Sequence, residues 1–145
     1  MRIRDILRQK GPKVVTIEPD RTVLEAIRRL VDHRIGALVV TRNHGSVVGI
    51  ITERDILRES AKRSDRLRET RVRDVMTTDV IIGLPDDDLD YVMGIMTKNR
   101  IRHLPVLKGE QLAGIISIGD VVNIQLERTG FENRMLRDYI HGITR

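Results

Sequence analysis

The stretch Gly-Ile-Ile-Thr-Glu-Arg-Asp at residues 49–55 decides the fold, because it recurs as Gly-Ile-Ile-Ser-Ile-Gly-Asp at residues 114–120. Each copy begins with apolar, β-branched residues that favour a buried strand. Each then places a hydroxyl residue three positions before an Asp, which is typical of a helix start. The stretch therefore predicts, twice, a strand that leads directly into a helix.

The repetition extends outward from this stretch over most of the chain. Three further blocks recur in the same order: 4–7 at 73–76, 16–20 at 82–86, and 34–40 at 100–106. The offset changes only from 69 residues, between Arg4 and Arg73, to 65 residues, between Gly49 and Gly114. Four matched blocks in one order indicate a tandem duplication.

Both copies have the same predicted plan of elements. Apolar strands are expected at 14–17 and 80–82, at 36–40 and 101–107, and at 47–51 and 112–116. Between the first two strands, helical apolar spacing begins after the N-cap candidates Thr22 and Asp88. The prediction is an α/β (α+β) fold of two tandem β-α-β-β-α repeats related by a pseudo-twofold axis.

The predicted organisation is repeat one at 1–62, a charged linker at 63–71, repeat two at 72–124 and a C-terminal helix at 125–145. A unit of about 60 residues buries little surface by itself. We therefore expect the two repeats to pack together.

Composition narrows the class of protein. Hydrophobic residues make up 40% of the 145 residues but aromatic residues only 2%, which predicts an aliphatic core. The chain has no Cys, which agrees with a reducing cytoplasm. It has no apolar run near the roughly 20 residues that span a bilayer, and no signal-peptide pattern at its start. The expectation is a cytoplasmic protein without a membrane segment.

The net charge of +5 leaves a polyanionic partner open, either nucleotide phosphate or nucleic acid. The 26 basic and 21 acidic residues are interspersed rather than blocked, which disfavours a nucleic-acid tail. The stacking aromatic residues expected of single-strand binders are also missing. Nucleic-acid binding is therefore the weaker alternative.

The Thr/Ser-x-x-Asp pattern itself points to a ligand. A helix N-terminus offers unpaired N–H groups and a positive dipole end, which suit phosphate. A carboxylate there can accept hydrogen bonds from the two vicinal hydroxyls of a ribose. The alternative is a helix-capping motif with no ligand at all.

These motifs, together with Ile-Arg-His-Leu-Pro-Val at 101–106, resemble the tandem CBS domain pair, or Bateman module. The resemblance covers nearly the whole chain and is strongest to short, stand-alone bacterial or archaeal proteins made of one such pair. It implies a non-catalytic regulatory sensor that binds an adenosyl ligand in two clefts between the repeats. AMP is the first expectation, with ADP, ATP or NAD as alternatives, and no cofactor is required.

The resemblance also implies the residues of the two clefts. Thr52, Arg54 and Asp55 would face Ile81, Arg102 and His103, whereas Ser117, Gly119 and Asp120 would face Val15, Gly36 and Ala37. Because Gly36-Ala37 of one repeat corresponds to Arg102-His103 of the other, the clefts should bind unequally. Alternatively, Arg102 is a solvated strand-end residue and His103 a packed strand residue.

No catalytic or metal-binding residues are expected. The run Asp86-Asp87-Asp88 is more simply explained by a helix start, and the four His residues lack ligand spacing. Apolar residues on the predicted helices favour a homodimer, and the family implies the same pairing. A regulated protein partner remains unidentified, and a purely structural dimerisation protein is a further alternative.

Overall fold

The computed structural model describes residues 1–43 and 45–130. The first half contains α1 (Ile3–Lys10), β1 (Thr16–Ile17), α2 (Val23–His33), β2 (Ala37–Arg42), β3 (Ser46–Thr52), α3 (Glu53–Arg63) and the 3₁₀ helix η1 (Ser64–Arg66). The second half contains α4 (Val72–Val75), α5 (Leu89–Asn99), β4 (His103–Lys108), β5 (Gln111–Ser117) and α6 (Ile118–Thr129). The predicted mixed α/β fold of two repeats is confirmed.

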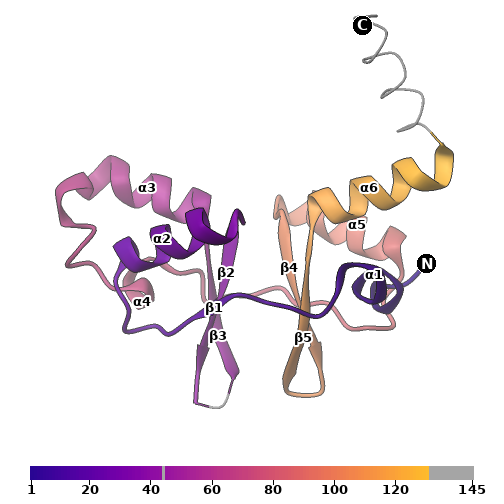
Figure 1. The fold of residues 1–145 in the computed structure, drawn as a ribbon, viewed down its shortest axis with the longest axis horizontal. Helices are drawn as coiled ribbons and strands as arrows, with labels where there is room; N and C mark the ends of the chain where they lie inside the picture. The colour runs from indigo at the N-terminus through magenta and orange to yellow at the C-terminus, as the bar shows by residue number, and fades with distance from the viewer. Residues whose placement is uncertain (44, 131–145) are drawn as a thin grey trace, which may run out of the picture.

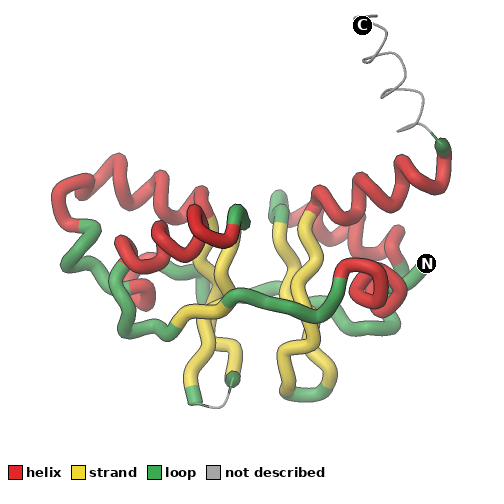
Figure 2. The backbone as a smooth tube through the Cα atoms, in the orientation of Figure 1, coloured by secondary structure: helices red, strands yellow, loops and turns green. Residues whose placement is uncertain are grey.

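Two antiparallel hairpins stand side by side in the middle of the molecule (Figure 1). In β2–β3, Ala37 pairs with Thr52, and in β4–β5, His103 pairs with Ser117 at the equivalent point. Both hairpins change register at the same place, after Val40 and after Val106. The helices α2, α3, α5 and α6 lie toward one end of the hairpins and the turns lie at the other, as the tube in Figure 2 also shows.

The strand predicted at 80–82 is not formed, whereas its counterpart β1 pairs in parallel with β2. In the second repeat one parallel bridge, between Gly83 and Val106, takes its place. Pro105 of β4 stands where β2 has Val39, and proline has no N–H to donate to a neighbouring strand. The second sheet consequently contains only β4 and β5.

The first helix of each repeat crosses to the other repeat, which the sequence analysis did not predict. Ile3 and Ile6 of α1 are fully buried in the core that contains Leu104 and the other apolar residues of the second repeat. Val72 of α4 is buried in the core of the first repeat. Figure 1 shows α1 beside the second hairpin and α4 beside α2. Each core is therefore completed by the other half of the chain.

Two equivalent glycines accommodate these crossing segments. A Cβ at Gly49 would lie 2.7 Å from Met76 Sδ and 2.9 Å from the Thr77 carbonyl oxygen. A Cβ at Gly114 would lie 2.6 Å from Leu7 Cδ2. The glycine that opens each repeated stretch therefore admits the segment that crosses from the opposite repeat.

The helix starts agree in part with the predicted caps. Thr22 accepts a hydrogen bond from the Glu25 amide at 3.2 Å, whereas Asp88 occupies the N-cap position of α5 without a side-chain cap bond. The predicted linker at 63–71 includes η1, and α3 runs to its first residue. The predicted helix at 125–145 begins inside α6 rather than as a separate element, and residues 131–145 lie outside the described residues.

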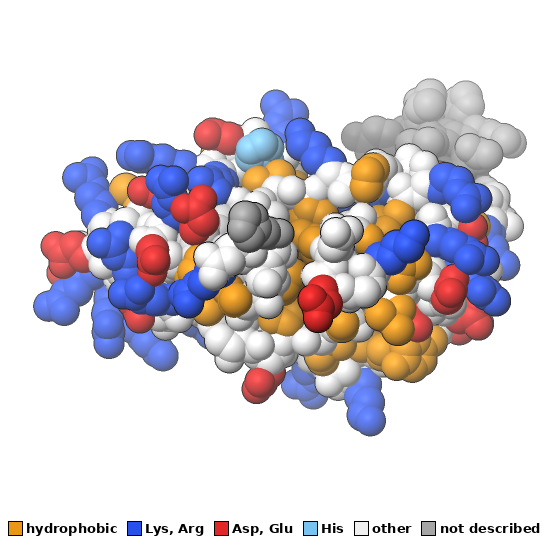
Figure 3. Space-filling view, turned by 90° about the horizontal axis from the view of Figure 1, so that it is seen from below, with side chains coloured by type: hydrophobic (Ala, Val, Ile, Leu, Met, Phe, Trp, Pro, Cys, Tyr) orange, Lys and Arg blue, Asp and Glu red, His pale blue; other side chains and the backbone are white. Residues whose placement is uncertain are grey.

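The surface has no continuous basic face in the direction that Figure 3 shows. Seen from the hairpin turns, Lys and Arg side chains gather toward the two ends, with acidic side chains among them. Apolar side chains are visible in the middle and to one side. The interspersed charges of the sequence thus remain interspersed on this face.

Candidate functional site

The larger cleft lies between the two repeats and has a volume of about 580 Å³. One wall comes from the junction of β3 and α3, with Thr52, Arg54 and Asp55. The opposite wall comes from the second repeat, with Ile81, Arg102 and His103. The structure therefore brings together all six residues predicted for the first cleft.

Thr52 and Asp55 form a reciprocal cap at the start of α3. Asp55 Oδ2 accepts hydrogen bonds from the Thr52 amide at 2.9 Å and the Thr52 hydroxyl at 3.1 Å, and the Thr52 Oγ1 accepts one from the Asp55 amide at 3.3 Å. These bonds fix the carboxylate at the cleft wall. The predicted cap is therefore formed, and it uses Oδ2 of Asp55 and leaves Oδ1 outside the cap.

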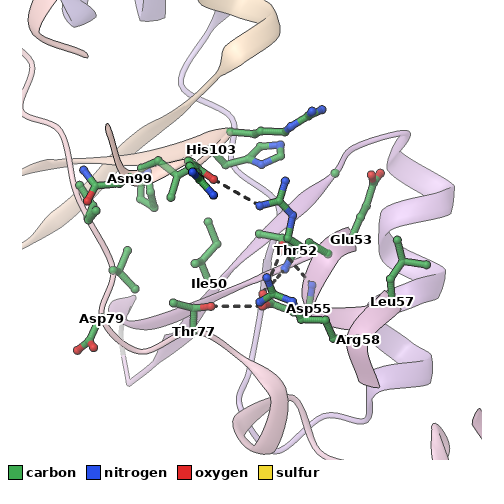
Figure 4. Close-up of a pocket in the computed structure, with 18 residues that line it drawn as sticks. Ile50, Thr52, Glu53, Asp55, Leu57, Arg58, Thr77, Asp79, Asn99 and His103 are labelled. Atoms are coloured by element: carbon green, nitrogen blue, oxygen red, sulfur yellow. Dashed lines mark hydrogen bonds between the residues drawn. The ribbon is translucent and has the colours of Figure 1, made fainter. Parts of the chain in front are cut away.

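Thr77 is a cleft residue that the sequence analysis missed. Its hydroxyl donates to Asp55 Oδ1 at 3.4 Å, as the dashed line in Figure 4 indicates. Its backbone pairs with Ile50 in both directions, at 2.8 Å and 3.0 Å. Only the crossing of α4 to the first repeat brings Thr77 here, so no local pattern could have identified it.

Basic side chains outnumber acidic ones in the lining of this cleft. Those that line it are Arg54, Arg58, Arg100, Arg102 and His103, against Glu53, Asp55 and Asp79. Arg54 also reaches across the cleft, donating to the Arg100 carbonyl oxygen at the long distance of 3.5 Å. The cleft thus combines a fixed carboxylate with several cationic groups that suit an anion.

The smaller cleft, of about 370 Å³, lies at the pseudo-equivalent position. Four of the predicted residues line it: Val15, Gly36, Ala37 and Ser117. Gly119 and Asp120 do not, although Asp120 forms the same reciprocal cap with Ser117, at 2.8 Å and 3.1 Å. Asp120 Oδ2 is instead held at 2.6 Å by the ammonium group of Lys10.

Lys10 alters the electrostatics of Asp120. Partial burial raises the pKa of the Asp120 carboxyl, but hydrogen bonds from Lys10 and Ser117 outweigh it and hold the pKa below its ordinary value. The carboxylate therefore stays ionised at neutral pH. Its charge is already paired within the chain, which distinguishes it from Asp55.

His103 and Gly36 lie between the two clefts and line both of them. A Cβ at Gly36 would lie 3.2 Å from two atoms of the His103 ring, so the imidazole fills the space that the glycine leaves. Burial lowers the pKa of His103, as do Lys10 and Arg102, against the opposite effect of Glu53 and Asp120. The side chain is therefore both packed and placed at the clefts, so the two interpretations of His103 are compatible.

The acidic run before α5 has structural contacts. Asp86 forms ion pairs with Arg4 at 2.8 Å and Arg2 at 3.7 Å, and Asp87 accepts a hydrogen bond from the Leu84 amide at 2.8 Å. Within residues 1–43 and 45–130, no three His, Cys, Asp or Glu side chains gather as a metal site would require. In the same residues, no helix has the length and apolar character to cross a bilayer.

The comparisons place this architecture in a known class. The family model for the CBS domain matches residues 3–62 and again residues 72–127. The chain belongs to this family, as a pair of CBS domains.

Individual relatives agree with this assignment. The CBS domain-containing protein CBSX3, mitochondrial, of Arabidopsis thaliana is 36% identical over 97% of this chain and 72% of its own length. A CBS-domain protein of Agrobacterium tumefaciens has a similar crystal structure, with a TM-score of 0.83 and 42% identity over 86% of this chain and 99% of that one.

A second similar structure contains ligands. The CBS domain pair of protein MJ0100, crystallised with 5′-methylthioadenosine and S-adenosyl-L-methionine, has a TM-score of 0.78 and 26% identity. The match covers 88% of this chain and 98% of that one.

Proposed function

We propose that the chain is a non-catalytic regulatory sensor that binds an adenosyl ligand, with AMP as the first candidate and ADP, ATP or NAD as alternatives. The observation that carries the proposal is the fixed Asp55 carboxylate, which lies in a cleft of nucleotide size opposite basic residues of the other repeat. Adenosyl ligands in the related pair of protein MJ0100 support the ligand class.

Each part of such a ligand has a counterpart in the larger cleft. Asp55 would accept hydrogen bonds from the ribose hydroxyls, with Thr77 exchanging its long bond for one to the ligand. Ile50, Ile81 and Ile101 supply apolar contacts for a purine ring. The neighbouring Arg side chains suit phosphate.

Sensing would follow from the way the cleft is built. Its two walls belong to different repeats, so a ligand that contacts both favours one relative arrangement of the repeats over others. We propose that a regulated protein or a second copy of the chain detects this shift. We further propose no catalytic role, and the cytoplasmic location stays a prediction.

The homodimer is part of the proposal. The helical end of the molecule exposes apolar side chains, with exposed fractions of 68% for Val31, 69% for Leu57 and 47% for Val122. An apolar groove of about 520 Å³ runs between α2 and α3 and includes Val31 and Leu57. Leu57 and Val122 occupy equivalent positions in the two repeats, so a second copy could cover both by twofold symmetry.

The test compares Asp55→Asn with wild type and with Asp65→Asn, a charge-matched control outside both clefts. Asparagine retains an oxygen for the Thr52 amide but loses the charge offered to the ribose. Losing charge-assisted hydrogen bonds corresponds to about 10- to 100-fold weaker binding. Titration calorimetry with AMP, ADP, ATP and NAD measures it.

Two results would contradict the proposal. Wild-type affinity in Asp55→Asn would leave Asp55 as a capping residue only. No heat from any of the four compounds at millimolar concentration would argue against the adenosyl ligand class, and binding of nucleic acid with steep salt dependence would favour the alternative.

A further inference from the structure

Lys10 makes the two clefts chemically different. It is the last residue of α1, the helix that crosses to the second repeat. Its ammonium group donates to Asp120 Oδ2 at 2.6 Å and to the Ile115 carbonyl oxygen at 2.8 Å. Lys10 thereby links the end of α1 to both β5 and the first turn of α6. It pairs with the carboxylate of Asp120, the residue that corresponds to Asp55 in the first repeat.

In the first cleft, the carbonyl oxygen and the carboxylate that correspond to those bound by Lys10 have other hydrogen-bond partners. There the Ile50 carbonyl oxygen, which corresponds to that of Ile115, accepts its bond from the Thr77 backbone amide at 2.8 Å. In the register that aligns Arg4 with Arg73, the counterpart of Lys10 is Asp79, which lines the first cleft. Within the described part of the chain, no cationic side chain lies within 4.0 Å of the Asp55 carboxylate.

The pair between Lys10 and Asp120 is more protected than the other ion pairs of the described residues. The two side chains are 32% and 22% exposed, whereas both partners of the short pair between Arg4 and Asp86 are at least 50% exposed. Reduced exposure strengthens a charge pair and reduces its screening by salt. A ligand that displaces Lys10 without offering it a new partner would therefore leave an ammonium group unpaired.

The remaining charges of the second cleft have the same sign as Lys10. Lys10, Lys13 and Arg34 are the charged side chains that line the cleft, beside His33 and His103, and its lining contains no Asp or Glu. A phosphate group is the natural new partner for an ammonium group in such surroundings. Lys10 lines the cleft whereas Asp120 does not, so a nucleoside whose ribose reaches Asp120 must displace Lys10, and an uncharged one offers Lys10 no anion in return.

We propose that Lys10 sorts ligands by charge at the second cleft, admitting phosphate-bearing adenosyl compounds and disfavouring uncharged ones. The first cleft, without a lysine at its carboxylate, accepts both kinds. This inference rests on the proposed function and specifies the ligand class of one of its two sites.

The experiment counts bound ligands on the full chain by titration calorimetry and native mass spectrometry. The probes are 5′-methylthioadenosine, which is uncharged, and ADP. Lys10→Met removes the charge and keeps most of the stem, Lys10→Arg keeps the charge, and Lys13→Met removes a charge from the same cleft without touching Asp120. Thermal melting checks that each variant is folded.

Opposite shifts are expected for the two probes. In Lys10→Met the second site should bind 5′-methylthioadenosine about tenfold more tightly and ADP about tenfold more weakly, since the carboxylate is freed and a charge-assisted bond to phosphate is lost. Lys10→Arg and Lys13→Met should keep the order of preference of the wild-type second site. The first site should change in none of them.

Shifts of the same sign for both probes, or no shift at the second site while the first site binds normally, would overturn the role of Lys10 and leave the proposed function standing. Absence of binding of both probes at both sites in wild type would overturn the proposed function and this inference together.

Discussion

The substitution Gly49→Ala tests whether the segment after α4 lies against β3. The added Cβ would meet Met76 Sδ at 2.7 Å and the Thr77 carbonyl oxygen at 2.9 Å. The sulfur can move with its side chain, but the carbonyl oxygen cannot, because Thr77 is paired with Ile50 through two backbone hydrogen bonds. Overpacking of this kind destabilises by about 1–3 kcal/mol.

Chemical denaturation in urea measures this loss, and a thermal melt should show a decrease of roughly 2–4 °C per kcal/mol. Gly114→Ala is the matched comparison: the three atoms nearest to its Cβ all belong to the side chain of Leu7, which can move, so this substitution should cost less. Gly94→Ala is the second control: it is exposed in α5 with nothing within 4 Å, and alanine there should stabilise by about 0.5–1 kcal/mol.

The reasoning is refuted if Gly49→Ala unfolds at the same urea concentration as wild type. Full recovery in the double variant Gly49→Ala with Met76→Ala would also contradict it, because that variant retains the Thr77 carbonyl oxygen. Either result would mean that the crossing segment is not held against β3 and that Thr77 is free to leave Asp55.

Two further predictions concern pH and assembly. Burial keeps the pKa of His103 below the ordinary value of about 6.5, so the unfolded chain binds the proton first as pH falls. The free energy of unfolding should therefore be constant above that value and decrease as the pH falls below it; His103→Gln should flatten this decrease, and an unchanged slope would assign it to other groups. Light scattering should give twice the chain mass of 16.6 kDa for wild type and for the control Leu84→Glu, and the monomer mass for Leu57→Glu. A monomeric wild type would exclude the proposed dimer.

Local sequence was sufficient for the repeats and for the two capped helix starts, whereas the facing residues of the first cleft were expected from the family resemblance. The strand-to-helix junctions at Thr52 and Ser117 follow from short-range preferences, because β-branched residues favour the strand and a hydroxyl residue with Asp three positions later caps the helix. Duplication then predicts two such junctions, and the family resemblance implies that each faces the other repeat.

Local sequence could not predict that α1 and α4 each cross to the other repeat. The segments around Ile6 and Val72 are too short to show which apolar surface they cover, and either repeat offers an aliphatic core of the same composition. The strand predicted at 80–82 is likewise absent because of Pro105, which lies at least 23 positions away in the sequence, on the neighbouring strand. Pairing between distant segments is set by the geometry of the whole chain.

The sequence by itself therefore determined the duplication and the two capped carboxylates, since each depends on neighbours along the chain. Tertiary structure decided which carboxylate remains available: the crossing of α1 places Lys10 on Asp120, and the crossing of α4 places Thr77 on Asp55. The physical reason is distance along the chain, because 110 residues separate Lys10 from its partner and no local periodicity relates them.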